Sequence, residues 1–167
     1  MTATDDLILA NAKLKSFAWR VAGLREFIIN VVLNGLIATI AYHKATSMSI
    51  AGTASLLAYF GPMSFFLPLI TTFFGHLNGV GARRAGVGPP WPQETRWKAT
   101  AIRSGLTLAC LCCPLCILAC LALHALTPNL QFSKWTGVAL IGLVSGIVGY
   151  VLHGAAVCRS ARIGRDG

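Results

Sequence analysis

Long apolar runs dominate the chain, and nearly all of its charged residues lie between them. Four runs are apparent, at about residues 27–43, 55–75, 101–126 and 136–157. About 20 helical residues cross a hydrocarbon core that is about 30 Å thick, and each run is close to that length. The pattern predicts an all-α fold, an integral membrane bundle of four transmembrane helices.

The connections between the runs indicate how the helices pair. A short connection joins the first run to the second, and another joins the third run to the fourth. Helices joined in this way are usually antiparallel neighbours. We therefore expect the first span to pack on the second and the third span to pack on the fourth.

Residues 7–25, ahead of the first run, have a helical pattern of their own. Their apolar members fall near one helical face, and they are Leu7, Leu14, Phe17, Val21 and Leu24. A basic amphipathic helix of this kind lies in the plane of the membrane interface, and the alternative is a flexible basic leader that only sets topology. We assign residues 1–26 to an amphipathic basic segment and residues 27–157 to the membrane domain.

Glycine and proline are frequent in residues 76–98, between the second and third runs. Such a composition favours turns and weak order, so we predict a loop there. Gly79 and Gly81 follow a predicted membrane span rather than a strand, and a phosphate-binding motif needs the strand. A short basic tail, residues 158–167, follows the fourth run.

Charge is placed very unevenly along the chain, whose net charge is +9. Twelve basic residues fall on one side of the predicted spans, namely Lys13, Lys15, Arg20, Arg25, Arg83, Arg84, Arg96, Lys98, Arg103, Arg159, Arg162 and Arg165. The other side has Lys44 and Lys134. Because an excess of Lys and Arg marks the cytoplasmic side, we predict that both termini and the loop at residues 76–98 are cytoplasmic.

The charge is therefore a topology signal, and we expect the lipid bilayer rather than nucleic acid as the partner. A multi-pass protein of the bacterial inner membrane is the default assignment. Charged residues make up 11% of the chain, whereas a soluble domain carries about 25%, so little remains for a soluble domain. The sequence contains no recognisable catalytic motif, and we expect neither enzyme activity nor a cofactor.

A polar stripe runs along the first predicted span. Glu26, Asn30 and Asn34 are spaced i, i+4 and i+8, which places them on one helical face. Other polar residues lie at a similar predicted depth on the second and third spans. The candidate substrate site comprises Glu26, Asn30, Asn34, Thr71, Thr72, Arg103 and Ser104. We expect these residues either to line a small cavity open to the cytoplasm, with Glu26 paired to Arg103, or to form a structural polar network.

Small residues recur along the fourth run. Gly142 and Gly146 form a GxxxG pattern, and Ser145 and Gly149 repeat its spacing. Small residues let two membrane helices approach closely. We predict that Gly142, Gly146 and Gly149 are helix-packing positions, either within one chain or between copies in a homo-oligomer.

Cysteine is concentrated in the third run, at Cys110, Cys112, Cys113, Cys116 and Cys120. Cys113 and Cys116 form a CxxC pattern, which makes them weak candidates for thiol redox chemistry or soft-metal binding. Cysteine is also a small residue that packs well in an apolar core, and packing is the interpretation we prefer. We expect no metal site built on the histidines, and we interpret His43, His76, His124 and His153 as a ring near the membrane interfaces.

The segment Arg25-Glu-Phe-Ile-Ile-Asn-Val-Val-Leu-Asn-Gly-Leu-Ile-Ala resembles a group of small uncharacterised bacterial four-span inner-membrane proteins, some of which are labelled permeases. The four-span layout and the basic Gly/Pro loop share this resemblance, so it covers most of the chain. The resemblance implies transport, and it supplies no site residues.

Three functions agree with these features. The first is a permease-like transporter that acts as a homo-oligomer, because four spans rarely enclose a pathway alone. The second is an accessory or structural subunit, whose polar network only holds the helices of a membrane complex together. The third is a membrane protein for thiol redox chemistry or soft-metal handling.

Overall fold

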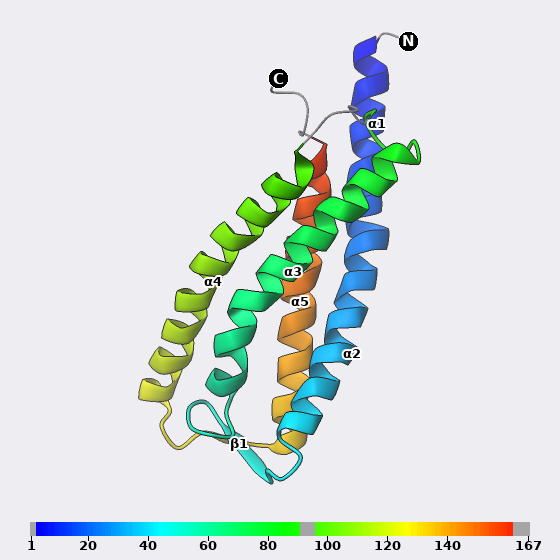
Figure 1. Ribbon diagram of the computed structural model, residues 1–167. Helices are drawn as coiled ribbons and strands as arrows, with labels where there is room; N and C mark the ends of the chain where they lie inside the picture. The colour runs from blue at the N-terminus through cyan, green and yellow to red at the C-terminus, as the bar shows by residue number, and fades with distance from the viewer. Residues whose placement is uncertain (1–2, 91–95, 162–167) are drawn as a thin grey trace.

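The computed structural model describes residues 3–90 and 96–161. Its helices are α1 (Ala3–Phe17), the π-helical turn η1 (Ala18–Gly23), α2 (Leu24–Ala41), α3 (Leu56–Arg84), α4 (Trp97–Leu126) and α5 (Lys134–Ser160) (Figure 1). Four helical segments are long and apolar enough to cross a membrane. The all-α fold with four candidate spans is therefore confirmed. Residues 91–95 of the predicted loop and residues 162–167 of the predicted tail lie outside the described part.

The N-terminal segment continues the first span. One helical stretch runs through α1, η1 and α2, with a candidate span of 38 residues from Thr4 to Ala41. Figure 1 shows α1 stacked end to end on α2 instead of turning across the bundle. At 1.5 Å per residue this stretch is about 57 Å long, so one end projects well beyond a hydrocarbon core. A helix lying flat beside the first span is not what the structure contains.

Helix α3 is longer than the sequence predicts. It continues to Arg84, although Gly75 was the expected end, so residues 76–84 are helical and not part of a loop. Gly79 lies within this extension, and a methyl group on it would come 2.2 Å from Ser160 Oγ of α5. Gly79 therefore serves close packing between helices and does not end the helix.

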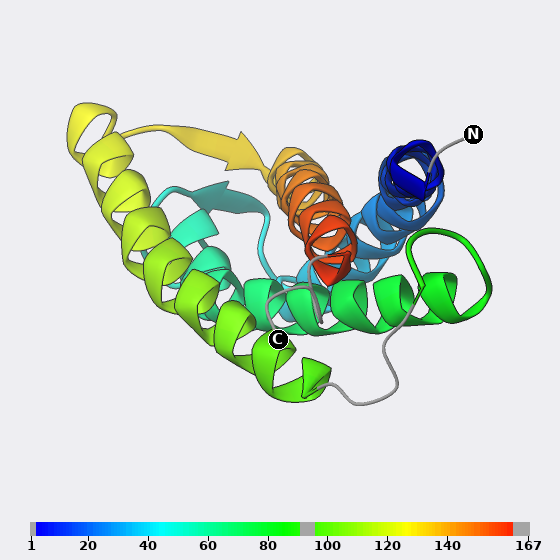
Figure 2. The ribbon, with the colours of Figure 1, turned by 90° about the horizontal axis from the view of Figure 1, so that it is seen from above.

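The helices are arranged around α5. Helix α2 packs on one side of α5 and α3 on another, while α4 packs on the outer side of α3 (Figure 2). The predicted pairing of the first span with the second and of the third with the fourth is therefore wrong. Loop length limits which helices can be neighbours. Which helices do become neighbours depends on where their backbones can approach each other closely.

Glycines account for the observed neighbours. A methyl group at Gly146 of α5 would come 2.5 Å from Val31 Cγ2 of α2, and one at Gly75 of α3 would come 2.6 Å from Ala156 Cβ of α5. On α4, a methyl group at Gly105 would come 3.0 Å from the Leu69 side chain of α3. Each main helix contact therefore has a glycine where the backbones come together.

Two short strands close the end of the bundle opposite the termini. Strands β1 (Ser47–Ser49) and β2 (Gln131–Ser133) pair antiparallel, with Met48 opposite Phe132. The side chain of Met48 is buried and packs with Ala38, Tyr59, Val138 and Ile141. The α2–α3 and α4–α5 connections thus form one small structure, here called the β clasp.

Arg83 ties the other end of the bundle together. Its Nε donates to Pro89 O at 2.8 Å and its Nη2 to Pro90 O at 2.6 Å. Its Nη1 donates to Ser160 O at the end of α5.

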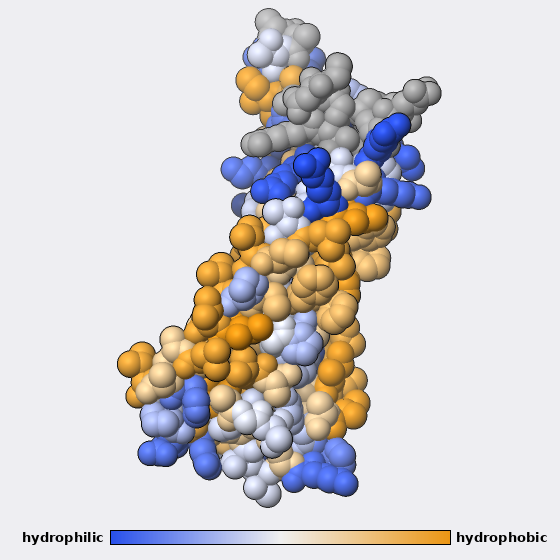
Figure 3. Space-filling view, turned by 60° about the vertical axis from the view of Figure 1, so that its left-hand side comes forward, coloured by the Kyte–Doolittle hydropathy of each residue, from blue (hydrophilic) through white to orange (hydrophobic). Residues whose placement is uncertain are grey.

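Between the two ends the surface is a broad apolar belt, with hydrophilic residues above and below it (Figure 3). This is the surface that a multi-pass membrane protein needs.

Candidate functional site

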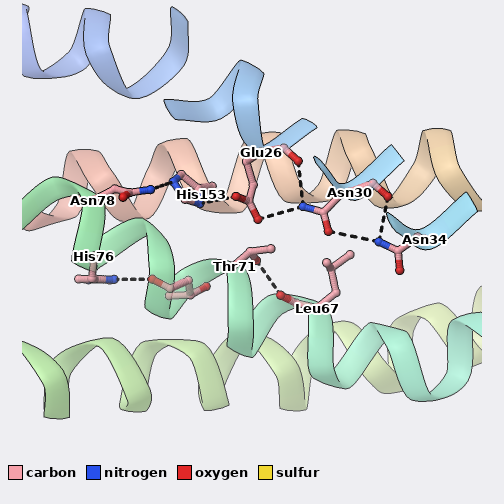
Figure 4. Close-up of polar contacts among 9 residues, drawn as sticks. Glu26, Asn30, Asn34, Leu67, Thr71, His76, Asn78 and His153 are labelled. Carbon is pink, nitrogen blue, oxygen red and sulfur yellow. Dashed lines mark hydrogen bonds and ion pairs between the residues drawn. The ribbon is translucent and has the colours of Figure 1, made fainter. Parts of the chain in front are cut away.

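The predicted stripe on α2 is a hydrogen-bonded chain of side chains, here called the polar row (Glu26, Asn30 and Asn34). Asn30 Nδ2 donates to Glu26 Oε1 at 3.0 Å and to Glu26 O at 2.9 Å (Figure 4). Asn34 Nδ2 donates to Asn30 Oδ1 at 3.2 Å and to Asn30 O at 3.0 Å. The row is therefore linked from one helical turn to the next.

These bonds keep the amides satisfied within α2 itself. Both asparagines are buried, yet each donates to side-chain and carbonyl oxygens four residues earlier in the same helix. Short polar side chains form such local bonds readily, and lipid offers no alternative partner. The row covers eight residues, or about 12 Å along the helix axis.

Other helices meet the polar row at its two ends. At the end near the termini, Glu26 Oε2 lies 3.4 Å from Nδ1 of His153 on α5. Asn78 Nδ2 of α3 lies 2.9 Å from His153 Nε2. With the Asn78 amide as donor, Nε2 is the acceptor and the imidazole proton is assigned to Nδ1, facing the carboxylate. Three helices therefore meet at His153, which is fully buried.

Tyr59 of α3 meets the opposite end of the row. Its hydroxyl donates to Asn34 Oδ1 at 3.0 Å and to Asn34 O at 3.1 Å. Tyr59 and Asn78 are 19 residues apart on α3, which corresponds to about 28 Å along the helix. The row and its two end contacts therefore reach over a distance close to the thickness of a hydrocarbon core.

Glycines of α5 lie against α2, and one of them, Gly149, faces the polar row. A methyl group at Gly149 of α5 would come 2.6 Å from Asn30 Nδ2, and one at Gly142 would come 3.0 Å from Val31 O. Together with Gly146, these residues form the glycine row of α5. The three glycines are thus packing positions within the chain, where α2 already occupies their face.

The threonines predicted for the site are buried on α3. The Thr71 hydroxyl donates to Leu67 O at 2.7 Å, and among the described residues Thr72 Oγ1 has no hydrogen-bond partner. No hydrogen bond links either side chain to the polar row in the described part of the chain. They are neighbours of the site and not part of its hydrogen-bonded chain.

Arg103 and Ser104 are not brought to the polar row. Arg103 is exposed on α4, and Ser104 is half-buried there. Helix α4 packs on α3 and extends away from α2 (Figures 1 and 2). Glu26 pairs with His153, so the expected pair between Glu26 and Arg103 is wrong.

The sequence analysis missed His153, Asn78 and Tyr59. It interpreted the histidines as an interfacial ring, but His153 is fully buried and His76 is 1% exposed. His76 Nδ1 instead contacts Thr72 O at 2.9 Å. One signal for His153 was present, because it follows Gly142, Gly146 and Gly149 at helical spacing and so shares their packed face.

The two cysteines of the CxxC pattern, Cys113 and Cys116, have different surroundings on α4. Cys113 Sγ lies 3.7 Å from Gly61 O of α3, whereas Cys112 and Cys116 line a cavity. All six cysteines are free. Within the described residues, no group of three or more His, Cys, Asp or Glu side chains is placed to hold a metal ion.

Comparison with known proteins gives no indication of function, so the function has to be inferred from the geometry of the site. No protein-family model, no curated protein and no solved structure matches the chain. The similarity of residues 25–38 to small four-span permease-like proteins therefore stays a prediction. What the site offers is a buried row of amides and one carboxyl group, anchored at both ends and facing glycine.

Proposed function

We propose that the protein is a permease-like transporter of the bacterial inner membrane that moves a small polar solute. The pathway runs between the polar row of α2 and the glycine row of α5. Both termini face the cytoplasm, in agreement with the basic residues near the N-terminus, around the α3–α4 connection and at the end of α5. Lys44 and Lys134 flank the β clasp on the outer side.

One observation carries this proposal: the amides of the polar row are satisfied within α2. Were the row only a means of joining helices, bonds from Asn30 and Asn34 to other helices would be expected. Asn30 donates within its own helix, and Asn34 receives one outside contact, from Tyr59. Helix α2 can therefore move away from α5 without leaving buried amides unpaired, which would cost about 1–3 kcal/mol each.

The glycines of α5 determine what would line the space between α2 and α5 if the two helices separated. Because α5 presents Gly142, Gly146 and Gly149, separation of the two helices would open a narrow gap, lined by peptide backbone, by the polar row near Gly149 and by the Phe27 and Val31 side chains near Gly146. Such a lining hydrogen-bonds a polar solute in place of water. His153 and Tyr59, which hold the ends of the row, must release it in turn, and this gives the two ends separate gates.

The test is solute flux in proteoliposomes. Purified protein is reconstituted, and entry of urea or glycerol is followed by stopped-flow light scattering after an osmotic step. We expect faster entry of at least one probe than in empty liposomes. Asn30→Leu keeps the branched shape of the side chain but removes its polar atoms, so flux should fall at least tenfold.

The matched control is Asn11→Leu. Asn11 makes the same kind of bond, from Nδ2 to Leu7 O at 2.9 Å, but lies on α1 outside the row. This variant should keep the wild-type flux. Equal loss in both variants, or wild-type rates no faster than those of empty liposomes for either probe, would contradict the proposal.

A second function is an accessory subunit of a membrane complex, and α4 is the observation that favours it. Only 6% of the most apolar 18-residue stretch of α4 is buried, and the main contact of this helix is with α3. A partner helix or a second copy would have to use a face of this kind, because the glycine row of α5 is already covered. Native mass spectrometry after gentle extraction distinguishes the cases: a homo-oligomer agrees with the permease, and a constant foreign subunit indicates the accessory role.

A further inference from the structure

A cavity of about 120 Å³ lies between α3, α4 and α5, away from the polar row. Its lining is mostly apolar and consists of Phe60, Met63, Ser64, Leu67, Pro68, Cys112, Cys116, Val144, Ser145 and Val148. Three of these residues carry sulfur: Met63 from α3 and the two cysteines from α4. The cavity therefore gathers soft donor atoms from two helices.

The sulfur-bearing residues line one cavity from two helices. Cys112 and Cys116 are spaced i, i+4, which puts their Cβ atoms about 5–6 Å apart on one face of α4. Met63 lines the same cavity from the neighbouring helix. Thiolate and thioether sulfur favour soft ions, above all Cu⁺. Met63 brings the number of sulfur donors that line the cavity to three.

Ser145 gives independent evidence that the cavity has a polar occupant. It lines the cavity and is 1% exposed, and its Oγ has no hydrogen-bond partner in the described part of the chain. A buried hydroxyl without a partner costs about 1–3 kcal/mol. A bound cation could take a lone pair from this oxygen, and a water molecule bound to that cation could accept or donate the missing hydrogen bond.

We propose that Cys112, Cys116 and Met63 form a thiol–thioether site for one monovalent soft cation of the Cu⁺ or Ag⁺ type. The proposal goes beyond solute transport and does not depend on the polar row. Charge selects a monovalent ion, because one thiol that loses its proton neutralises it. A divalent ion would need two thiolates or leave an uncompensated charge in an apolar cavity, which is costly.

Binding needs no oxidant or reductant. One thiol S–H bond breaks, one metal–sulfur bond forms, and one proton leaves to solvent for each ion bound. The second thiol and the thioether donate lone pairs without losing a proton. The ion keeps its oxidation state throughout.

Two variants with equal numbers of cysteines test the site. The first retains Cys112 and Cys116, with serine at the other four cysteine positions. The second retains Cys113 and Cys116, the CxxC pair, with serine at the remaining four. Both are titrated with Ag⁺ in detergent and without reductant, and bound ions are counted by native mass spectrometry.

We expect the first variant to bind one Ag⁺ at least tenfold more tightly than the second, with about one proton released per ion. Adding Met63→Leu to the first should weaken binding, whereas adding Asn30→Leu should not. Equal affinity in the two variants, or no binding by the first, would overturn the proposal.

Protection from alkylation repeats the test in the unaltered chain, in case a serine variant does not fold. Ag⁺ should shield Cys112 and Cys116 from N-ethylmaleimide more than it shields exposed Cys110. Equal shielding of the three thiols would count against the site.

Discussion

Single residues show how a membrane helix carries polar side chains without a polar partner helix. Asn30 and Asn34 each donate a hydrogen bond to the preceding turn of α2. The helix itself therefore supplies the hydrogen-bond acceptors that lipid lacks. Glu26 is different, because its second carboxylate oxygen lies beside His153 of α5. The residue that joins the helices is thus the histidine, which contacts α2 and α3 at once.

His153→Ala should therefore destabilise the bundle. The change leaves the Asn78 amide and the Glu26 carboxyl group without their partner and opens a cavity, so we expect the free energy of unfolding to fall by at least about 2 kcal/mol. Denaturant titration in detergent, followed by circular dichroism, measures the loss. His43→Ala, at an exposed position, should change stability by less than about 0.5 kcal/mol, and an equal effect of both changes would contradict the role given to His153.

Between elements, backbone proximity determines which helices are neighbours. Helix α5 carries glycine toward α2, while α3 carries glycine toward α5. Neither contact joins helices that are consecutive spans linked by a short outer loop. Each of these contacts instead depends on the absence of a side chain at two or more positions.

Gly146→Ala tests this dependence. The added methyl group would lie 2.5 Å from Val31 Cγ2, and overpacking of this kind costs about 1–3 kcal/mol. Gly35→Ala on α2 is the matched control, since a methyl group there meets nothing within 4 Å. It should be neutral or stabilising by up to about 1 kcal/mol through helix propensity. Unfolding in detergent separates the two, and similar stability of both variants would refute the packing argument.

Much of this level of structure was accessible from the sequence, and the reasons for the rest are physical. Apolar run length predicted four helices, and helical spacing predicted that Glu26, Asn30 and Asn34 share a face. Spacing does not say which helix lies opposite, so Arg103 was assigned wrongly and His153 was missed. The glycines at residues 76–84 predict a loop, but in the structure Gly79 allows close contact between α3 and α5. Glycine suits both loops and closely packed helices, so composition alone does not distinguish the two.

For the whole molecule, the two ends of the bundle differ in charge and in construction. The end with the termini carries most basic residues and is tied by Arg83, while the opposite end is closed by the β clasp. The expected orientation places the β clasp outside the cytoplasm. It also predicts which end a reporter must occupy to be active.

Reporter fusions measure this orientation. Alkaline phosphatase, which is active outside the cytoplasm, should be inactive at the C-terminus and active when inserted at Gly52, where φ is +119° and the chain turns at the surface. Green fluorescent protein at the C-terminus should fluoresce. The reverse pattern would invert the topology and move the polar row's carboxyl end to the outer side.

The central position of α5 has a consequence for biogenesis. A ribosome delivers this helix after α2, α3 and α4, yet α2 makes its main packing contact with it and α3 packs on it as well as on α4. Before α5 is inserted, α3 and α4 can already pack against each other in the bilayer. The first span, however, still lacks α5, the helix against which it packs. The bundle can only be completed once α5 has been made, so we expect the unfinished protein to be most exposed to membrane proteases in the interval before α5 is inserted.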